Sequence, residues 1–147
     1  LVKYPKMDLS MVMPIKERIE MMYKGQIKDT SSLQKVFATN QGYARVTFPM
    51  VPVDKKGEKV TLNLKARFFW EDMPFGCIVL KNIGQLVGVE TPNIDKQIQF
   101  HQKFMPVKYL DECNQLIRES LEETGAPMRY NVMTADALVE SSLPRLC

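Results

Sequence analysis

Several residue types that build reactive centres are scarce in this chain of 147 residues. It has one histidine, one tryptophan and three cysteines, and Cys77, Cys113 and Cys147 show neither close pairing nor the short spacing of metal ligands. The seven glycines form no Gly-x-Gly-x-x-Gly pattern, so we expect no Rossmann phosphate-binding turn in this sequence. Unpaired cysteines suit a reducing compartment, which predicts a cytoplasmic location.

Long apolar runs and an excess of one charge are also missing. No span approaches the roughly eighteen apolar residues of a membrane helix, and residues 1–6 lack the apolar core of a signal peptide. The twenty basic residues are interleaved with seventeen acidic ones, which leaves a net charge of only +3. We therefore expect no nucleic-acid or membrane partner. The 45% hydrophobic content is ordinary for a globular domain.

The spacing of apolar residues predicts a mainly helical chain. The expected helices cover 13–23, 31–40 with a capping box from Ser31 to Gln34, a deeply buried stretch between Pro74 and Gly88, 92–105, 108–124 ending at Gly125, and a short segment from Thr134. Valines around a polar turn, Asp54-Lys55-Lys56-Gly57, predict a small hairpin or irregular ordered loop near 46–64.

The segment around Arg67 and Asp72 carries the strongest indication of chemistry. Arg67 stands five residues before Asp72, which we expect at the N-terminus of the apolar helix, with Arg67 on the preceding loop. An arginine can hold a carboxylate through two hydrogen bonds, and a carboxylate at a helix N-terminus can orient a histidine. The alternative is a helix cap beside a structural ion pair. Trp70 is equally compatible with a substrate pocket and with the core.

Two phrases of this sequence resemble the C-terminal domain of the octopine and nopaline (opine) dehydrogenases. The first comprises Arg67, Glu71, Asp72, Met73, Pro74 and Gly76, and the second comprises Val87, Gly88, Val89, Thr91, Pro92, Ile94 and Asp95. The resemblance covers nearly the whole chain. It implies that residues 1–147 are the helical C-terminal substrate-binding and catalytic domain of a two-domain dehydrogenase similar in fold to 6-phosphogluconate dehydrogenase. It also implies that the Rossmann domain and the start of the helical domain lie upstream.

The activity implied by the resemblance is an NAD(P)H-dependent reductive condensation of an amino acid with an α-keto acid such as pyruvate. NAD or NADP is then bound mainly by the upstream Rossmann domain, which is the chief partner of this chain. Arg67 and Asp72 match the arginine and aspartate that complete a His-Arg-Asp relay with an upstream histidine, and Trp70 could line the substrate pocket. We expect the chain to be inactive without the upstream domain.

Two other functions stay open. The chain could be a catalytically inactive family member that serves as a structural or interaction module, or part of a dehydrogenase for a different 2-keto or 2-hydroxy acid. His101 falls on the apolar face of its helix, so we expect a packed histidine. Asn131 stands where the family usually has glycine, which requires that it adopt a left-handed backbone.

Overall fold

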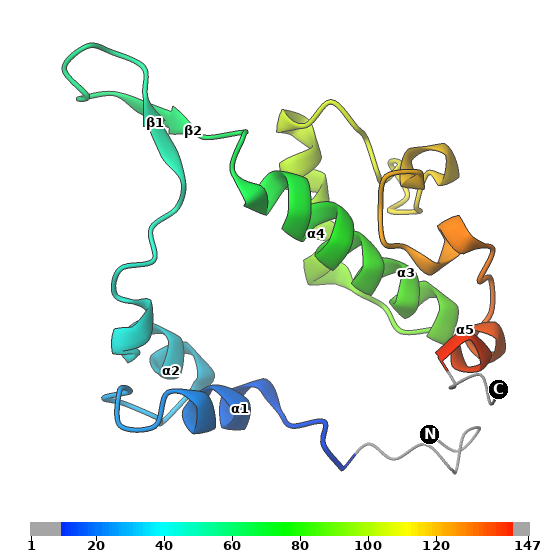
Figure 1. Cartoon of the computed structure of the whole chain (residues 1–147), viewed down its shortest axis with the longest axis horizontal. Helices are drawn as coiled ribbons and strands as arrows, with labels where there is room; N and C mark the ends of the chain where they lie inside the picture. The colour runs from blue at the N-terminus through cyan, green and yellow to red at the C-terminus, as the bar shows by residue number, and fades with distance from the viewer. Residues whose placement is uncertain (1–9, 143–147) are drawn as a thin grey trace, which may run out of the picture. The chain divides into compact units, whose positions relative to one another are not determined.

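The structure, a computed structural model, describes residues 10–142, so Cys147 and residues 1–6 lie outside the part discussed below. The chain forms two compact units, one ending at Phe48 and the other beginning at Pro49. Within residues 10–142 there are five α-helices and one small antiparallel sheet (Figure 1). The predicted mainly helical fold is confirmed. None of the described helices is long and apolar enough to cross a membrane.

The first unit contains α1 (Ile15–Met22) and α2 (Leu33–Thr39), close to the predicted ranges. Ile19 of α1 and Val36 of α2 are buried. The expected cap of α2 is wrong by one residue, because the Ser32 hydroxyl accepts the Lys35 N–H at 3.2 Å. The N–H of Ser31 instead donates to Asp29 Oδ1 at 2.9 Å, which closes the turn before the helix.

The predicted hairpin opens the second unit. Strands β1 (Met50–Pro52) and β2 (Val60–Leu62) pair in antiparallel fashion, with Val51 opposite Thr61. Gly57 in the connecting loop has a φ of +73°, a backbone conformation that suits glycine. Figure 1 shows the loop as an open tip beyond the two strands.

A continuous helical segment follows, formed by a π-helix (Phe68–Cys77) that leads directly into α3 (Ile78–Val87). Pro74 has no N–H to donate, and its carbonyl accepts the Gly125 N–H at 3.3 Å. The Ile78 N–H reaches back five residues to the carbonyl of Met73, which gives the π-helical pairing. The predicted end of α3 at Gly88 is confirmed by its left-handed φ of 72°.

Two expectations about this segment are wrong. Asp72 does not cap the apolar helix, because the helical backbone begins earlier and Asp72 lies inside the π-helix, with Arg67 at its N-terminal boundary. Helix α3 is also not buried all round. Ile78 and Asn82 are fully buried, whereas Leu80 and Val87 are 56% and 48% exposed, because the neighbouring elements cover one face only.

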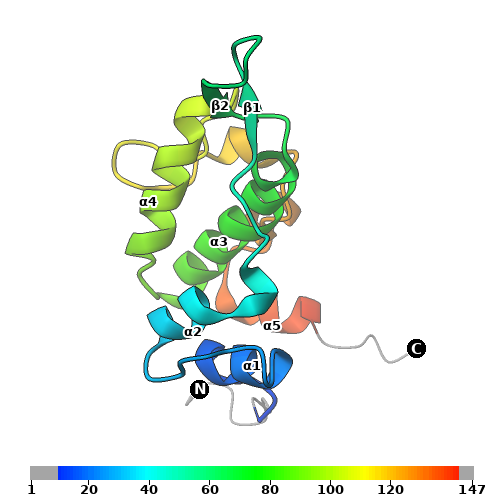
Figure 2. The ribbon, with the colours of Figure 1, turned by 90° about the vertical axis from the view of Figure 1, so that its left-hand side faces the viewer.

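Helix α4 (Pro92–His101) runs alongside α3 (Figure 2), and a buried ion pair joins the two helices. Lys81 Nζ lies 2.8 Å from Asp95 Oδ1, and these side chains are only 8% and 13% exposed. The Thr91 hydroxyl also donates to Asp95 Oδ1, at 3.1 Å. Thr91 occupies the predicted N-cap position but makes no side-chain bond to a helix N–H. Its side chain serves the ion pair instead.

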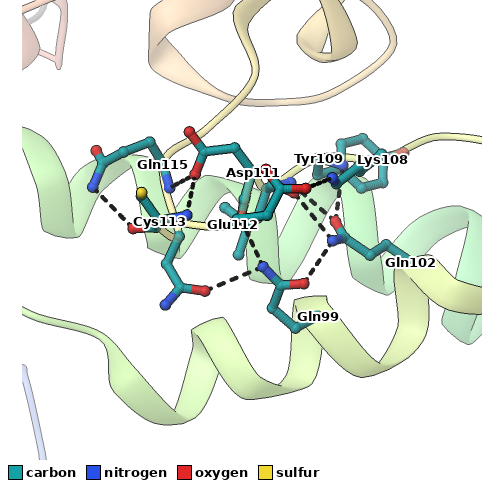
Figure 3. Close-up of polar contacts among 10 residues, drawn as sticks. Gln99, Gln102, Lys108, Tyr109, Asp111, Glu112, Cys113 and Gln115 are labelled. Atoms are coloured by element: carbon teal, nitrogen blue, oxygen red, sulfur yellow. Dashed lines mark hydrogen bonds and ion pairs between the residues drawn. The ribbon is translucent and has the colours of Figure 1, made fainter.

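The helix predicted over 108–124 is wrong. This stretch is a loop with an isolated bridge between Leu110 and Leu116, followed by a short 3-10 helix, Arg118–Leu121. Gln99 of α4 and Gln102, which follows its last residue, bond to backbone groups that a helix would need (Figure 3). Gln102 accepts the Leu110 N–H at 2.9 Å and donates to its carbonyl at 3.1 Å, while Gln99 donates to the Asp111 carbonyl at 2.8 Å.

Gly125 therefore does not end a helix. A Cβ at this position would lie 3.1 Å from Val79 Cγ2 and 3.3 Å from Phe75 Cδ1, so glycine permits the close approach that brings its N–H to Pro74. A second 3-10 turn, Pro127–Tyr130, follows, and the predicted last helix is present as α5 (Ala135–Ser142). Asn131 adopts the required left-handed conformation, with φ 60° and ψ 20°.

The core of the second unit is built from the helical segment, α4 and the loops after it. Its buried apolar members are Met73, Ile78, Ile98, Tyr109, Leu110, Leu121 and Ala126. Cys77 packs against this cluster as a half-buried side chain, as expected for a small core residue.

We predict that Asp95→Asn lowers the free energy of unfolding by about 3 kcal/mol, because it leaves the Lys81 charge buried without a counterion. Urea unfolding followed by circular dichroism measures the change. Glu112→Gln is the matched control, since its pair with Lys108 is exposed and should contribute little to stability. Equal losses in the two variants would contradict a structural role for the buried pair.

Candidate functional site

Arg67 and Asp72 lie at the start of the same helical segment but do not contact each other. Arg67 Nη2 pairs with Glu71 Oε2 at 3.2 Å, and these side chains are 69% and 60% exposed. Within residues 10–142 no hydrogen bond or ion pair joins Arg67 to Asp72. The exposed pair with Glu71 contributes little stability, so the guanidinium can exchange it for another carboxylate at small cost.

Asp72 carries an exposed carboxylate without a hydrogen bond or ion pair in the described part of the chain. Its negative charge acts on Cys77, five residues later. Burial raises the pKa of the Cys77 thiol, and the Asp72 carboxylate raises this pKa further. Gly76 lies between them in sequence, and a Cβ at Gly76 would have no other atom within 4 Å.

The helical segment that carries Asp72 also has exposed apolar side chains. Phe68 and Leu80, on the same helical segment, are 44% and 56% exposed. An exposed carboxylate makes a stronger hydrogen bond once a second surface excludes water from it. The Asp72 carboxylate could accept a hydrogen bond from the imidazole N–H of a histidine that approaches this side of the helix.

Trp70 is neither a core residue nor a cover over Asp72. Its ring is 49% exposed, and the indole Nε1–H donates to the Leu64 carbonyl at 2.6 Å. It borders a groove of about 600 Å³ whose lining includes Phe75 and Tyr109 but neither Arg67 nor Asp72. The predicted role of Trp70 in substrate binding stays a prediction.

His101 is the packed histidine that the sequence predicts. Its Nδ1 lies 2.8 Å from the Gln97 carbonyl, and its ring meets those of Phe69 and Phe100 edge-on at centroid distances of 5.4 and 5.3 Å. It is half-buried and remains within its own helix and the adjacent aromatic side chains.

Sequence reasoning missed the pairing of Lys81 with Asp95, although Asp95 belongs to the second matched phrase. The signal was available, because Lys81 is the only charged residue within Ile78–Val87. A lone lysine in an apolar helix needs a counterion when the helix packs. No group of three or more His, Cys, Asp or Glu side chains in the described residues is placed to hold a metal ion.

Known proteins match both the sequence and the fold. Residues 5–105 match the family model of the NAD/NADP octopine/nopaline dehydrogenase alpha-helical domain. Tauropine dehydrogenase of Arabella iricolor is 34% identical over 132 residues, which is 90% of this chain and 32% of that protein. Octopine dehydrogenase solved with NADH and L-arginine superposes with a TM-score of 0.83 at 30% identity, covering 97% of this chain and 34% of the other.

A further structure of octopine dehydrogenase, with NADH and pyruvate, gives a TM-score of 0.63 at 26% identity, covering 87% of this chain and 34% of the other. The chain thus spans about a third of the length of these relatives. The predicted fold, a helical portion of a larger dehydrogenase, is confirmed by these matches.

We predict that Asp72→Asn makes Cys77 react roughly twofold or more faster with iodoacetamide at pH 8. Removing the nearby negative charge lowers the thiol pKa and increases the thiolate fraction. Mass spectrometry of the Cys77 peptide measures the rate. Glu71→Gln removes an adjacent carboxylate that is not among the charges acting on Cys77, and should leave the rate unchanged. Equal rates in wild type and Asp72→Asn would contradict the placement of Asp72.

Proposed function

Because the chain belongs to the octopine/nopaline dehydrogenase family, we propose that it forms the substrate domain of an opine dehydrogenase. The reaction joins the amino group of an amino acid to the carbonyl carbon of an α-keto acid such as pyruvate. Water leaves, and hydride addition with a proton gives the secondary amine. The amino acid remains unassigned, since selectivity depends on a pocket built from more than this chain.

The observation that carries this proposal is the state of Asp72. The Asp72 carboxylate, part of the family phrase, is exposed and has no hydrogen bond or ion pair within the described residues, while Met73 and Pro74 next to it in sequence are buried. If Asp72 were a helix cap or part of a structural ion pair, its carboxylate would bond to a backbone N–H or to a cationic side chain. Support also comes from Arg67, whose present contact with Glu71 is exposed and weak.

The two residues take separate roles. Asp72 accepts the Nδ1–H of a histidine supplied by the rest of the polypeptide, which fixes the histidine tautomer and stabilises the imidazolium form. The histidine then manages the proton of the carbonyl oxygen. Arg67 releases Glu71 and binds a substrate carboxylate through two hydrogen bonds.

The described residues do not fit a dinucleotide site of their own. The second unit has no glycine-rich turn at a helix N-terminus, and α4 begins with Thr91-Pro92, which places a proline at its first position. NADH or NADPH, which supplies the hydride, is therefore assigned to the preceding Rossmann domain. The Asp72 carboxylate and the Arg67 guanidinium are the contributions of this chain.

We predict that Asp72→Asn and Arg67→Ala each lower kcat/KM of the full-length protein by roughly a hundredfold or more. Oxidation of NADH or NADPH is followed with pyruvate and a panel of amino acids. For Asp72→Asn the loss should lie mainly in kcat, and for Arg67→Ala partly in the KM of a carboxylate substrate. Glu90→Gln, an exposed carboxylate on the same unit, is the control and should retain activity.

Full activity in the Asp72→Asn protein would overturn the proposed relay. Failure of the full-length protein to bind NADH and NADPH at all would favour the structural or interaction module over the enzyme.

A further inference from the structure

A pocket of about 430 Å³ lies against α3, away from the residues of the proposed relay. Its size falls in the range of small-molecule sites. Among the described residues no charged side chain lines this pocket, in contrast to the groove beside Trp70. Helix α3 contributes Asn82, Gln85 and Leu86 to the lining, and the chain after α4 contributes Leu116, Met128 and Met133.

Asn82 brings an unsatisfied hydrogen-bond donor to this pocket. Its side chain is fully buried, and its Oδ1 accepts the Met128 N–H at 2.8 Å. Since a backbone N–H can only donate, this bond fixes the orientation of the Asn82 amide. The Nδ2 atom at the other end has no hydrogen-bond partner within residues 10–142. A buried donor without a partner is costly, so an acceptor is expected to complete it.

Gln85, three residues further along α3, brings an unsatisfied acceptor. Its Nε2 donates to Gln115 Oε1 at 3.0 Å, and Gln115 Nε2 donates in turn to the Cys113 carbonyl at 3.5 Å (Figure 3). These bonds orient the Gln85 amide, and its Oε1 is left buried and unpartnered in the part of the chain that the structure describes. Residues at i and i+3 are neighbours on a helix surface. The pocket therefore offers one donor and one acceptor from adjacent side chains.

The rest of the lining decides what kind of molecule could satisfy both atoms. A single water takes up about 30 Å³ and needs two to four polar partners, so it would leave most of this pocket unfilled. A charged ligand would lose its hydration without gaining a counter-charge. Two leucines and two methionines form the apolar part of the wall. The lining thus favours an uncharged ligand with an apolar body.

Access to the two amides requires movement of side chains. Asn82 Nδ2 and Gln85 Oε1 are closed off from solvent, so a ligand must displace a neighbouring side chain to reach them. Gln115 and Met133 belong to the lining and are both exposed. The bond from Gln85 to Gln115 is also exposed, and a methionine side chain adapts its shape readily. These two side chains can give way without a change in the backbone.

We propose that this pocket binds a small neutral molecule that carries a primary carboxamide. The carbonyl of the ligand accepts a hydrogen bond from Asn82 Nδ2, and one of its N–H groups donates to Gln85 Oε1. Its apolar body packs against the leucines and methionines of the lining. Neither Arg67 nor Asp72 lines the pocket, so the site does not rest on the proposed dehydrogenase activity.

The test follows the methyl signals of Met128 and Met133 by NMR in the full-length protein, with each signal assigned by its loss in Met128→Leu or Met133→Leu. The probe is n-butyramide. The controls are N,N-dimethylbutyramide, which lacks the N–H groups, and 2-pentanone, which keeps only the carbonyl. We expect a saturable shift of both signals with n-butyramide, and an apparent Kd about tenfold higher with each control.

A variant tests the acceptor separately. Gln85→Met keeps the length of the side chain but removes Oε1, and the apparent Kd for n-butyramide should rise about tenfold. Gln97→Met makes the same change at an exposed glutamine of α4 outside the pocket, and should leave the Kd unchanged. Circular dichroism confirms that both variants fold.

Three results would overturn the proposal. Equal affinity for n-butyramide and N,N-dimethylbutyramide would show a merely apolar pocket, and unchanged affinity in Gln85→Met would remove the role of the acceptor. No saturable shift with n-butyramide would show that water or another part of the polypeptide already satisfies the two amides. The comparison of the three ligands uses the wild-type protein, so it stays decisive even if Gln85→Met does not fold.

Discussion

The ion pair between Lys81 and Asp95 is the contact on which the second unit depends most. Bringing both charges out of water costs several kcal/mol per ion, which a short contact and further hydrogen bonds must offset. The 2.8 Å separation and the Thr91 hydroxyl provide that compensation. Because the pair fixes α4 against α3, it also positions Gln102 at the C-terminal end of α4, which holds the loop of Tyr109 and Leu110. The position of α4 and of the loop that contains Tyr109 and Leu110 thus depends on the ion pair between Lys81 and Asp95.

A second constraint places Asp72. Pro74 cannot donate a hydrogen bond, and its carbonyl is engaged by Gly125 from a distant part of the chain. The helix accommodates both conditions by adopting the π-helical pairing over Phe68–Cys77. π-Helical turns frequently occur at functional sites, and here the turn brings Asp72 and Cys77 within electrostatic reach of each other. The carboxylate stays exposed while Met73 and Pro74 beside it are buried.

Local signals in the sequence predicted element boundaries correctly where the backbone preference of a glycine or proline sets the boundary. Gly88, Pro92 and the turn at Gly57 set the boundaries of α3, α4 and the hairpin as predicted. The stretch 108–124 failed because its apolar spacing suits a helix, while Gln99 and Gln102 of another helix capture its backbone groups. That competition depends on tertiary contacts, which periodicity does not record. The proposed roles of Arg67 and Asp72 were suggested by the family phrase, and the absence of a partner for Asp72 within the described residues came from the structure alone.

The central proposal is that a histidine from elsewhere in the full-length protein pairs with the exposed Asp72 carboxylate. A crystal structure of the full-length protein with NADH tests it most directly. The account predicts an imidazole nitrogen at about 3 Å from an Asp72 oxygen, with water excluded by the second surface. An Asp72 carboxylate that remains in solvent, with no histidine within reach, would contradict it.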